Sequence, residues 1–162
     1  MSRIESLIAE VKKAQSEAQA VAVEPPAEKT ESARIRGLIE AQRKAVKAAG
    51  TEVPVLLGGE EIVVAFSALT GEDWCDIVDH HPPRANVVRD ETAGFNRATL
   101  PRDFPTDHVL VGGEEVSSDL WVEMLGVLDG KGRELISTAL WGMQVLEPTR
   151  ALDRARKERN DG

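Results

Sequence analysis

The chain has 162 residues, of which 41% are hydrophobic and 30% are charged, and this suits one globular domain with an extension. Its net charge of −8 is unevenly distributed: residues 1–50 carry +2, residues 51–148 carry −12 and residues 149–162 carry +2. An acidic body repels phosphate, so this distribution excludes a nucleic-acid-binding protein that is held by counterion release.

The sequence contains no segment that predicts a membrane span. The longest run without a charged residue, 135–146, is well short of the roughly 20 apolar residues that a bilayer crossing needs. Glu5 interrupts the start of the chain where a signal peptide requires an apolar segment, so we expect a cytoplasmic protein. The single cysteine, Cys75, permits no internal disulfide, and we expect it to be a small packed side chain.

Two amphipathic helices are predicted in the first 50 residues. A Ser-x-x-Glu capping box opens the first, at about 3–22, whose apolar residues recur at alternating steps of three and four. The segment 23–31 contains two consecutive prolines and interrupts the pattern. The second helix is predicted at about 32–49, with Gly50 as its stop.

Both helices have narrow, alanine-rich apolar faces, which leave neither helix stable alone in water. Each needs a partner, and the candidates are the other helix in an antiparallel hairpin, a second copy of the chain in a homo-oligomer, or a different protein. We therefore interpret residues 1–50 as a partner-binding or oligomerising arm that is dispensable for folding of the body, residues 51–148. The candidate partner-binding residues of this arm are Ile4, Leu7, Val11, Ile35 and Ile39.

A β-hairpin is predicted at 53–66, where two strand-like runs flank Gly58-Gly59. Pro54 cannot donate to a ladder, so the first strand is expected at an edge or outside the pairing. A similar Gly-Gly-Glu-Glu sequence follows at 112–115, but the flanking residues do not match. We interpret the similarity as one kind of turn used twice.

A short helix is predicted at about 71–80, capped by Thr70 and ended by Pro82-Pro83. Residues 84–117 carry scattered prolines and glycines, and we expect loops there with one or two short helical or extended pieces.

Two further helices complete the predicted body. The first is capped by Ser117 or Ser118 and stopped by Gly130, and the last core helix spans about 131–146. The charged residues 149–162 should fray or be disordered as a flexible tail. The predicted fold class is thus mainly α (α+β), with an N-terminal helical arm or hairpin, a β-hairpin and a small helical body.

One cluster of side chains is compatible with metal chemistry. Asp76 and His80 are four residues apart on one helix, and His108 is the only distant histidine that could join them. The alternative, which we favour, is that the histidines end a helix, where a cation complements the helix dipole, and that the acidic residues face solvent.

The tryptophans and methionines of the last two helices suit either a core or an exposed binding groove. We expect most of them in the core. The exception is Trp121, which we predict to be a partner-binding residue because its neighbour Leu120 points elsewhere on the helix.

A helix that runs into His-Pro-Pro-Arg, followed by Gly-Phe-Asn, a Leu-Trp helix and a final Trp helix, resembles the tail assembly chaperones of siphophages that infect actinobacteria. The resemblance covers about residues 60–148. The motif residues that carry it are Trp74, Asp76, His81, Pro82, Pro83, Arg84, Gly94, Phe95 and Asn96.

The resemblance implies a non-catalytic protein without a cofactor that works in the host cytoplasm. Such chaperones bind the long, helical tape measure protein and help the tail tube protein to polymerise around it. The resemblance also implies a longer form of the chain, made by programmed ribosomal frameshifting. Two other classes remain open: a structural phage protein such as a head-tail connector component, and a metalloenzyme that uses Asp76, His80 and His108.

Overall fold

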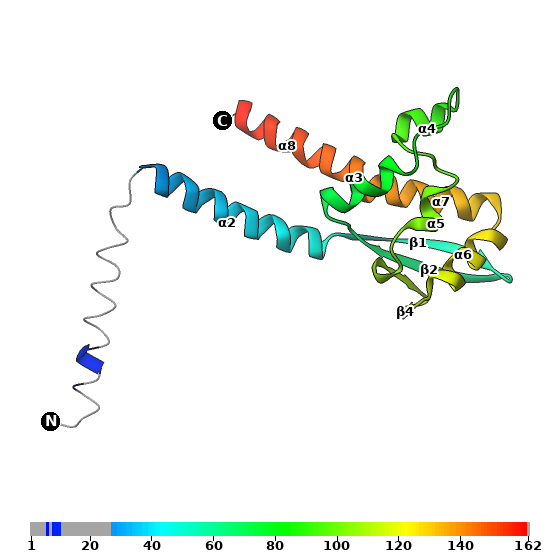
Figure 1. Cartoon of the computed structure of the whole chain (residues 1–162), viewed down its shortest axis with the longest axis horizontal. Helices are drawn as coiled ribbons and strands as arrows, with labels where there is room; N and C mark the ends of the chain where they lie inside the picture. Colours follow the sequence, from blue (N-terminus) through cyan, green and yellow to red (C-terminus); the bar gives the residue numbers. More distant parts are fainter. Residues whose placement is uncertain (1–5, 7, 11–26, 162) are drawn as a thin grey trace. The chain divides into compact units, whose positions relative to one another are not determined.

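The computed structural model of the chain describes residues 6, 8–10 and 27–161 (Figure 1). Most of the predicted helix 3–22 therefore lies outside the described residues, although residues 6 and 8–10 are helical. The chain divides into two compact units, Met1–Lys44 and Ala45–Gly162. The arm that was expected to end at residue 50 is thus six residues shorter.

Helix α2 (Ala27–Ala48) starts directly after the Pro25-Pro26 pair, earlier than the predicted helix 32–49. Alanine, arginine, lysine and glutamate are strong helix formers, and their high frequency in this segment explains why the helix begins as early as Ala27. Ion pairs three residues apart, Arg34 with Glu31 and Arg43 with Glu40, support its exposed surface.

The four strands form one antiparallel sheet in the order β1-β2-β3-β4, which confirms the α+β class. The strands are β1 (Gly50–Leu57), β2 (Glu60–Ser67), β3 (Val109–Val111) and β4 (Glu114–Glu115). The predicted hairpin is confirmed as the β1–β2 pair, in which Val53 lies opposite Val64.

Both hairpins turn through two glycines with positive φ angles. These angles are 61° and 82° at Gly58 and Gly59, and 61° and 83° at Gly112 and Gly113. Turns with two positive φ angles match the right-handed twist of the strands they connect, and glycine adopts them without strain. The interpretation of the repeated sequence as one turn used twice is therefore confirmed.

Gly50 is not the predicted helix stop, because it begins β1. A Cβ atom at Gly50 would lie 2.6 Å from the carbonyl oxygen of Phe66, so this position requires glycine. The N–H of Ala68 donates to the carbonyl of Ala49, at 3.0 Å, and Val46 packs against the core. Residues 45–50 consequently belong to the body and not to a dispensable arm.

This boundary gives a testable expectation for truncated chains. Deletion of residues 1–44 should leave a cooperative thermal transition close to that of the full chain. Deletion of residues 1–50 should lower the free energy of unfolding by about 2 kcal/mol, because the Val46 packing and the Ala49 hydrogen bond are lost. Equal melting curves for the two truncations, measured by circular dichroism, would contradict the assignment.

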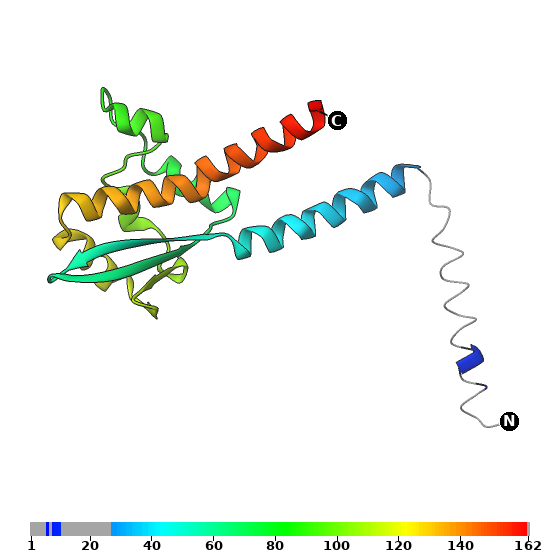
Figure 2. The same cartoon turned by 180° about the vertical axis from the view of Figure 1, so that it is seen from behind.

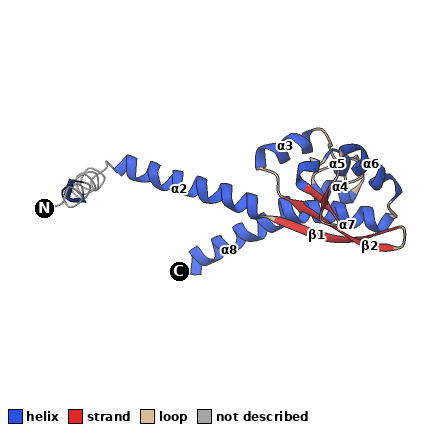
Figure 3. Ribbon diagram, turned by 90° about the horizontal axis from the view of Figure 1, so that it is seen from below, coloured by secondary structure: helices blue, strands red, loops and turns tan. Residues whose placement is uncertain are grey.

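One face of the sheet carries the core. The inward-facing residues are Val53, Val55, Val64, Phe66 and Val109. Figure 3 shows the short helices of the body gathered on one side of the strands. The strand that contains Pro54, β1, lies at an edge of the sheet, which confirms one of the two positions predicted from that proline. Helix α7 (Gly130–Trp141) runs beside this strand (Figures 1 and 2).

Helix α3 (Gly71–Asp79) begins where Thr70 predicted it, with the Thr70 Oγ1 atom accepting a hydrogen bond from the N–H of Asp73 at 3.2 Å. Helices α4 (Val88–Ala93) and α5 (Leu100–Asp103) and the 3₁₀ turn η1 (Thr106–His108) follow.

The expectation for residues 84–117, loops with one or two short helical or extended pieces, understated the order of this segment, which contains α4, α5, η1, β3 and β4. It also supplies core side chains, among them Phe95, Leu100 and Phe104, which are 0%, 0% and 1% exposed. These residues follow no helical or strand period, so the sequence pattern could not identify them as core.

Helix α6 (Ser118–Val127) has Ser117 as its N-cap, and the Ser117 Oγ atom accepts from the N–H of Leu120 at 3.1 Å. The predicted stop at Gly130 was wrong, because Gly130 is the first residue of α7. Asp129 caps that helix and accepts from the N–H of Gly132 at 2.7 Å.

The C-terminal residues are helical, which overturns the predicted frayed tail at 149–162. After α7 comes a π-helical turn, η2 (Gly142–Leu146), and then α8 (Glu147–Asp161). The N–H of Glu147 bonds to the carbonyl of Gly142, five residues back. This wider turn lies directly before Pro148, which has no N–H and whose ring would crowd a regular α-helical turn.

Candidate functional site

The exposed apolar residues of α2 form the first candidate surface. Ile35, Leu38 and Ile39 recur at steps of three and one along the helix and are 44%, 52% and 46% exposed. We call these three residues the apolar stripe. Two predicted partner-binding residues, Ile35 and Ile39, lie on it, and the sequence analysis missed Leu38 as a third. The predicted residues Ile4, Leu7 and Val11 lie outside the described residues.

Trp121 is not the exposed binding residue that we predicted. Its side chain is 0% exposed, and its indole Nε1 donates to the carbonyl oxygen of Pro101 at 2.8 Å. The ring also meets Phe66 edge to face, with centroids 5.9 Å apart. Trp121 is therefore a core residue. Burial of its indole is possible because the N–H donates to an acceptor on α5, twenty residues earlier in the chain.

Several of the motif residues contact one another around Phe95, whereas Asp76, Pro82 and Pro83 are exposed. Trp74 meets Phe95 edge to face at a centroid distance of 5.4 Å. Gly94 ends α4 with a φ angle of 85°, a conformation that favours glycine. Asn96 donates its backbone N–H to the carbonyl of His81 at 2.8 Å, and its Oδ1 atom accepts from the N–H groups of Ala98 and Thr99.

His81 fixes the exit from α3. The imidazole is 8% exposed, and its two nitrogens hydrogen-bond the Thr99 hydroxyl at 2.8 Å and the Asp103 carboxylate at 2.7 Å. Both ring nitrogens are therefore occupied, and the Pro82-Pro83 pair follows immediately in a non-helical segment.

Asp90 is the most buried charged group of the described body, at 0% exposure. Its carboxylate accepts from the backbone N–H, Nε and Nη2 of Arg84, at 3.1, 2.7 and 3.1 Å, and from the N–H of Arg97 at 3.2 Å. The hydrogen bonds from Arg84 lower the pKa of Asp90 to about 2, against the opposing effect of desolvation. The sequence analysis placed Arg84 in the family motif but missed its partner Asp90.

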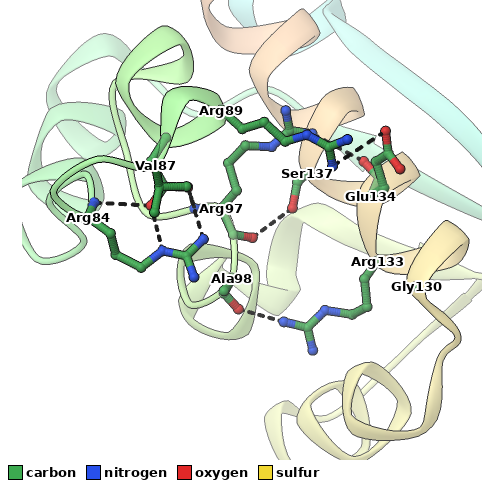
Figure 4. A pocket seen from close by; sticks show the side chains of 10 residues that line it. Arg84, Val87, Arg89, Arg97, Ala98, Gly130, Arg133, Glu134 and Ser137 are labelled. Atoms are coloured by element: carbon green, nitrogen blue, oxygen red, sulfur yellow. Dashed lines mark hydrogen bonds and ion pairs between the residues drawn. The ribbon is translucent and has the colours of Figure 1, made fainter.

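A hollow of about 310 Å³ lies beside Asp90 and is lined by four arginines (Figure 4). These are Arg84, Arg89, Arg97 and Arg133, four of the six cationic residues in 51–148. Desolvation lowers the pKa of Arg97 and Arg133, and the neighbouring charge of Arg89 lowers that of Arg97 further.

The guanidinium groups around this hollow are engaged with acceptors of the chain itself. Arg97 donates to the Thr138 hydroxyl at 2.6 Å, and Arg133 donates to the carbonyls of Leu125 and Ala98. Ser137, which is also buried, donates to the carbonyl of Arg97 at 2.8 Å. The cluster therefore ties the irregular segment 84–98 to α7, and we interpret it as structural.

The residues proposed for a metal site are not brought together. His80 donates its Nδ1 N–H to the Asp76 carbonyl at 2.7 Å, whereas His108 hydrogen-bonds the Ser67 hydroxyl at 3.0 Å. Within the part of the chain that the structure describes, no group of three His, Cys, Asp or Glu side chains is placed to hold a metal ion. Cys75 is exposed, so its expected packing was wrong: it is the neighbouring Trp74 that faces the core.

Comparisons with known families, curated proteins and solved structures find no match for this chain. Residues 27–161 and the few described residues before them contain no helix that is both long and apolar enough to cross a bilayer.

Proposed function

We propose that this chain is a non-catalytic tail assembly chaperone that binds the helical tape measure protein of a siphophage and promotes tail tube assembly. The observation that carries the proposal is the apolar stripe of α2, whose three aliphatic side chains are about half exposed. A single helix of this kind is marginally stable in water unless a partner covers its apolar face. A long helical client supplies such a cover by helix-to-helix packing.

The body contributes a stable and strongly acidic carrier for this helix. Residues 51–148 have a net charge of −12, which favours solubility of a complex with an aggregation-prone client. Of the motif residues on which the resemblance to tail assembly chaperones depends, Trp74 contacts the ring of Phe95 and His81 is hydrogen-bonded to Asn96 and Thr99. The tail tube protein and a longer frameshifted form of the chain are further partners under this proposal.

Replacing Ile35 and Ile39 together by aspartate tests whether the apolar stripe binds the client. Burial of each aliphatic side chain is worth about 1.5–3 kcal/mol, so the double variant should bind the tape measure protein at least about a hundredfold more weakly. The measurement is a pull-down of coexpressed tape measure protein, titrated against the unmodified chain.

Ala33→Asp is the matched control, because Ala33 is exposed and lies on the opposite side of α2 from the apolar stripe. It adds one negative charge to the same helix, where the double variant adds two, and we expect it to retain the client. Since the contact is mainly apolar, retention should depend weakly on salt. Full retention of the client by the Ile35→Asp, Ile39→Asp variant would show that the apolar stripe does not bind the client and would contradict the proposal.

A further inference from the structure

The outer face of the sheet is a second apolar surface without cover in the described body. Strand residues alternate between the two faces, and the outward positions include Leu56, Val63 and Leu110, which are 57%, 41% and 40% exposed. Pro54 lies directly opposite Val63, and Ala65 lies directly opposite Leu110. We call these five residues the open face. An antiparallel sheet normally presents polar side chains to solvent, so this composition indicates a contact surface.

Glutamates surround the open face through the strand register. Glu61 lies opposite Leu56, Glu115 opposite Leu110 and Glu52 opposite Ala65. The two hairpins, 50–67 and 109–116, contain five glutamates and neither lysine nor arginine. The surface is therefore apolar at its centre and negatively charged at its rim.

A hollow of about 230 Å³ deepens one end of the open face. It is lined by Pro54, Val55, Leu56 and Glu61 from the hairpin, by Asp129, and by Lys131, Gly132 and Leu135 from α7, so that one cation lies among its two carboxylates. Its walls are mainly apolar, and it is large enough to receive an aliphatic side chain.

Helix α2 has the complementary character. Its sequence contains six lysines and arginines against three glutamates, a net charge of +3, and Arg34 and Arg43 lie on either side of the apolar stripe. The chain thus carries one basic helix with an uncovered apolar stripe and one acidic sheet with an uncovered apolar face. Electrostatic complementarity of this kind sets orientation and excludes like-charged pairings such as α2 with α2.

We propose that the apolar stripe of α2 in one copy of the chain docks on the open face of a second copy. The two surfaces of such a contact differ, so a dimer keeps one free sheet on the first copy and one free helix on the second, and association continues into rings or open chains. The contact does not depend on the tape measure protein. Because a client on α2 would use the same stripe, client binding and self-association should compete.

Two variants separate the two halves of this contact. The helix variant is Ile35→Asp with Ile39→Asp. The sheet variant is Leu56→Lys with Leu110→Lys, which removes apolar side chains and places positive charge against α2. Each new lysine lies opposite a glutamate, Glu61 or Glu115, so the cross-strand pairs should preserve the sheet. Melting curves monitored by circular dichroism establish that both variants are folded.

Sedimentation velocity gives the decisive measurement. The unmodified chain should associate increasingly between about 10 and 300 µM, and the association should weaken at least fivefold when salt rises from about 0.05 to 0.5 M. Each variant alone should remain monomeric, and Ala33→Asp should associate like the unmodified chain. A mixture of the two variants should form a one-to-one dimer that grows no further, since only one intact helix and one intact sheet remain.

Three results would overturn the inference: a monomeric unmodified chain throughout this range, a sheet variant that associates like the unmodified chain, or a mixture without the dimer. As a further test, association that is no weaker in about 0.5 M salt than in about 0.05 M salt would overturn it even if a variant did not fold. The sheet variant also separates this inference from the proposed function. It keeps α2 intact, so retention of the tape measure protein by a monomeric sheet variant supports both, and loss of the client without loss of self-association contradicts both.

Discussion

Replacement of Trp121 by alanine should lower the free energy of unfolding by about 4 kcal/mol, the largest effect that we expect from one substitution in this chain. The side chain is 0% exposed and contacts Phe66 at a centroid distance of 5.9 Å. Its removal creates a cavity and leaves the buried carbonyl of Pro101 without its donor. Denaturation in urea, followed by circular dichroism, measures the loss.

A matched pair of tryptophan-to-phenylalanine variants isolates the hydrogen bond. Trp121→Phe removes the N–H that donates to Pro101, whereas the buried Nε1 of Trp141 has no hydrogen-bond partner among the described residues. Trp121→Phe should therefore cost about 1–3 kcal/mol more than Trp141→Phe. If Trp121→Ala weakened client binding while leaving the urea midpoint unchanged, Trp121 would be the surface residue that the sequence suggested.

Asp90 should make the stability of the body pH-dependent in the acid range. Its pKa is lowered from 3.8 to about 2 in the folded chain, so the unfolded chain binds the proton more readily. The stabilisation is fully present above the unfolded value of 3.8 and is lost as the pH falls through about 2. We expect the thermal midpoint to fall steeply across this window.

Asp90→Asn should remove that contribution and flatten the dependence between about pH 4 and 2. At neutral pH the substitution should cost about 2–3 kcal/mol, because Arg84 loses charge-assisted hydrogen bonds from its Nε and Nη2 atoms. Asp153→Asn, at an exposed position of α8, is the control and should leave the acid profile unchanged. Identical acid profiles for Asp90→Asn and the unmodified chain would show that the Arg84–Asp90 pair contributes little.

The Arg84–Asp90 pair also illustrates what a sequence pattern misses. Asp90 is an ordinary acidic residue in a segment without periodicity, and its burial depends on donors from both Arg84 and Arg97. The open face could not be recognised from the sequence for a similar reason. The strands carry apolar residues on both faces of the sheet, such as the buried Val64 and the exposed Val63, so the alternation did not show which face is uncovered before the strand register was known.

The sequence by itself determined the features that depend on neighbouring residues. The glycine pair of each hairpin, the Thr70 cap and the edge position of Pro54 follow from local dihedral and hydrogen-bonding preferences, and the structure confirms them. The sequence offered Ser117 or Ser118 as the cap of α6, and the structure selects Ser117.

Only the tertiary structure decided which aromatic side chains are buried and how the last helix continues. Phe95, Phe104 and Trp121 meet partners from distant parts of the chain, and the helix continues past Pro148 because a π-helical turn precedes it. Each of these outcomes depends on contacts or backbone geometry that no local pattern contains. For this reason Trp121, predicted as a surface residue, is buried in the core, whereas the alanine-rich helix α2 keeps Ile35, Leu38 and Ile39 exposed.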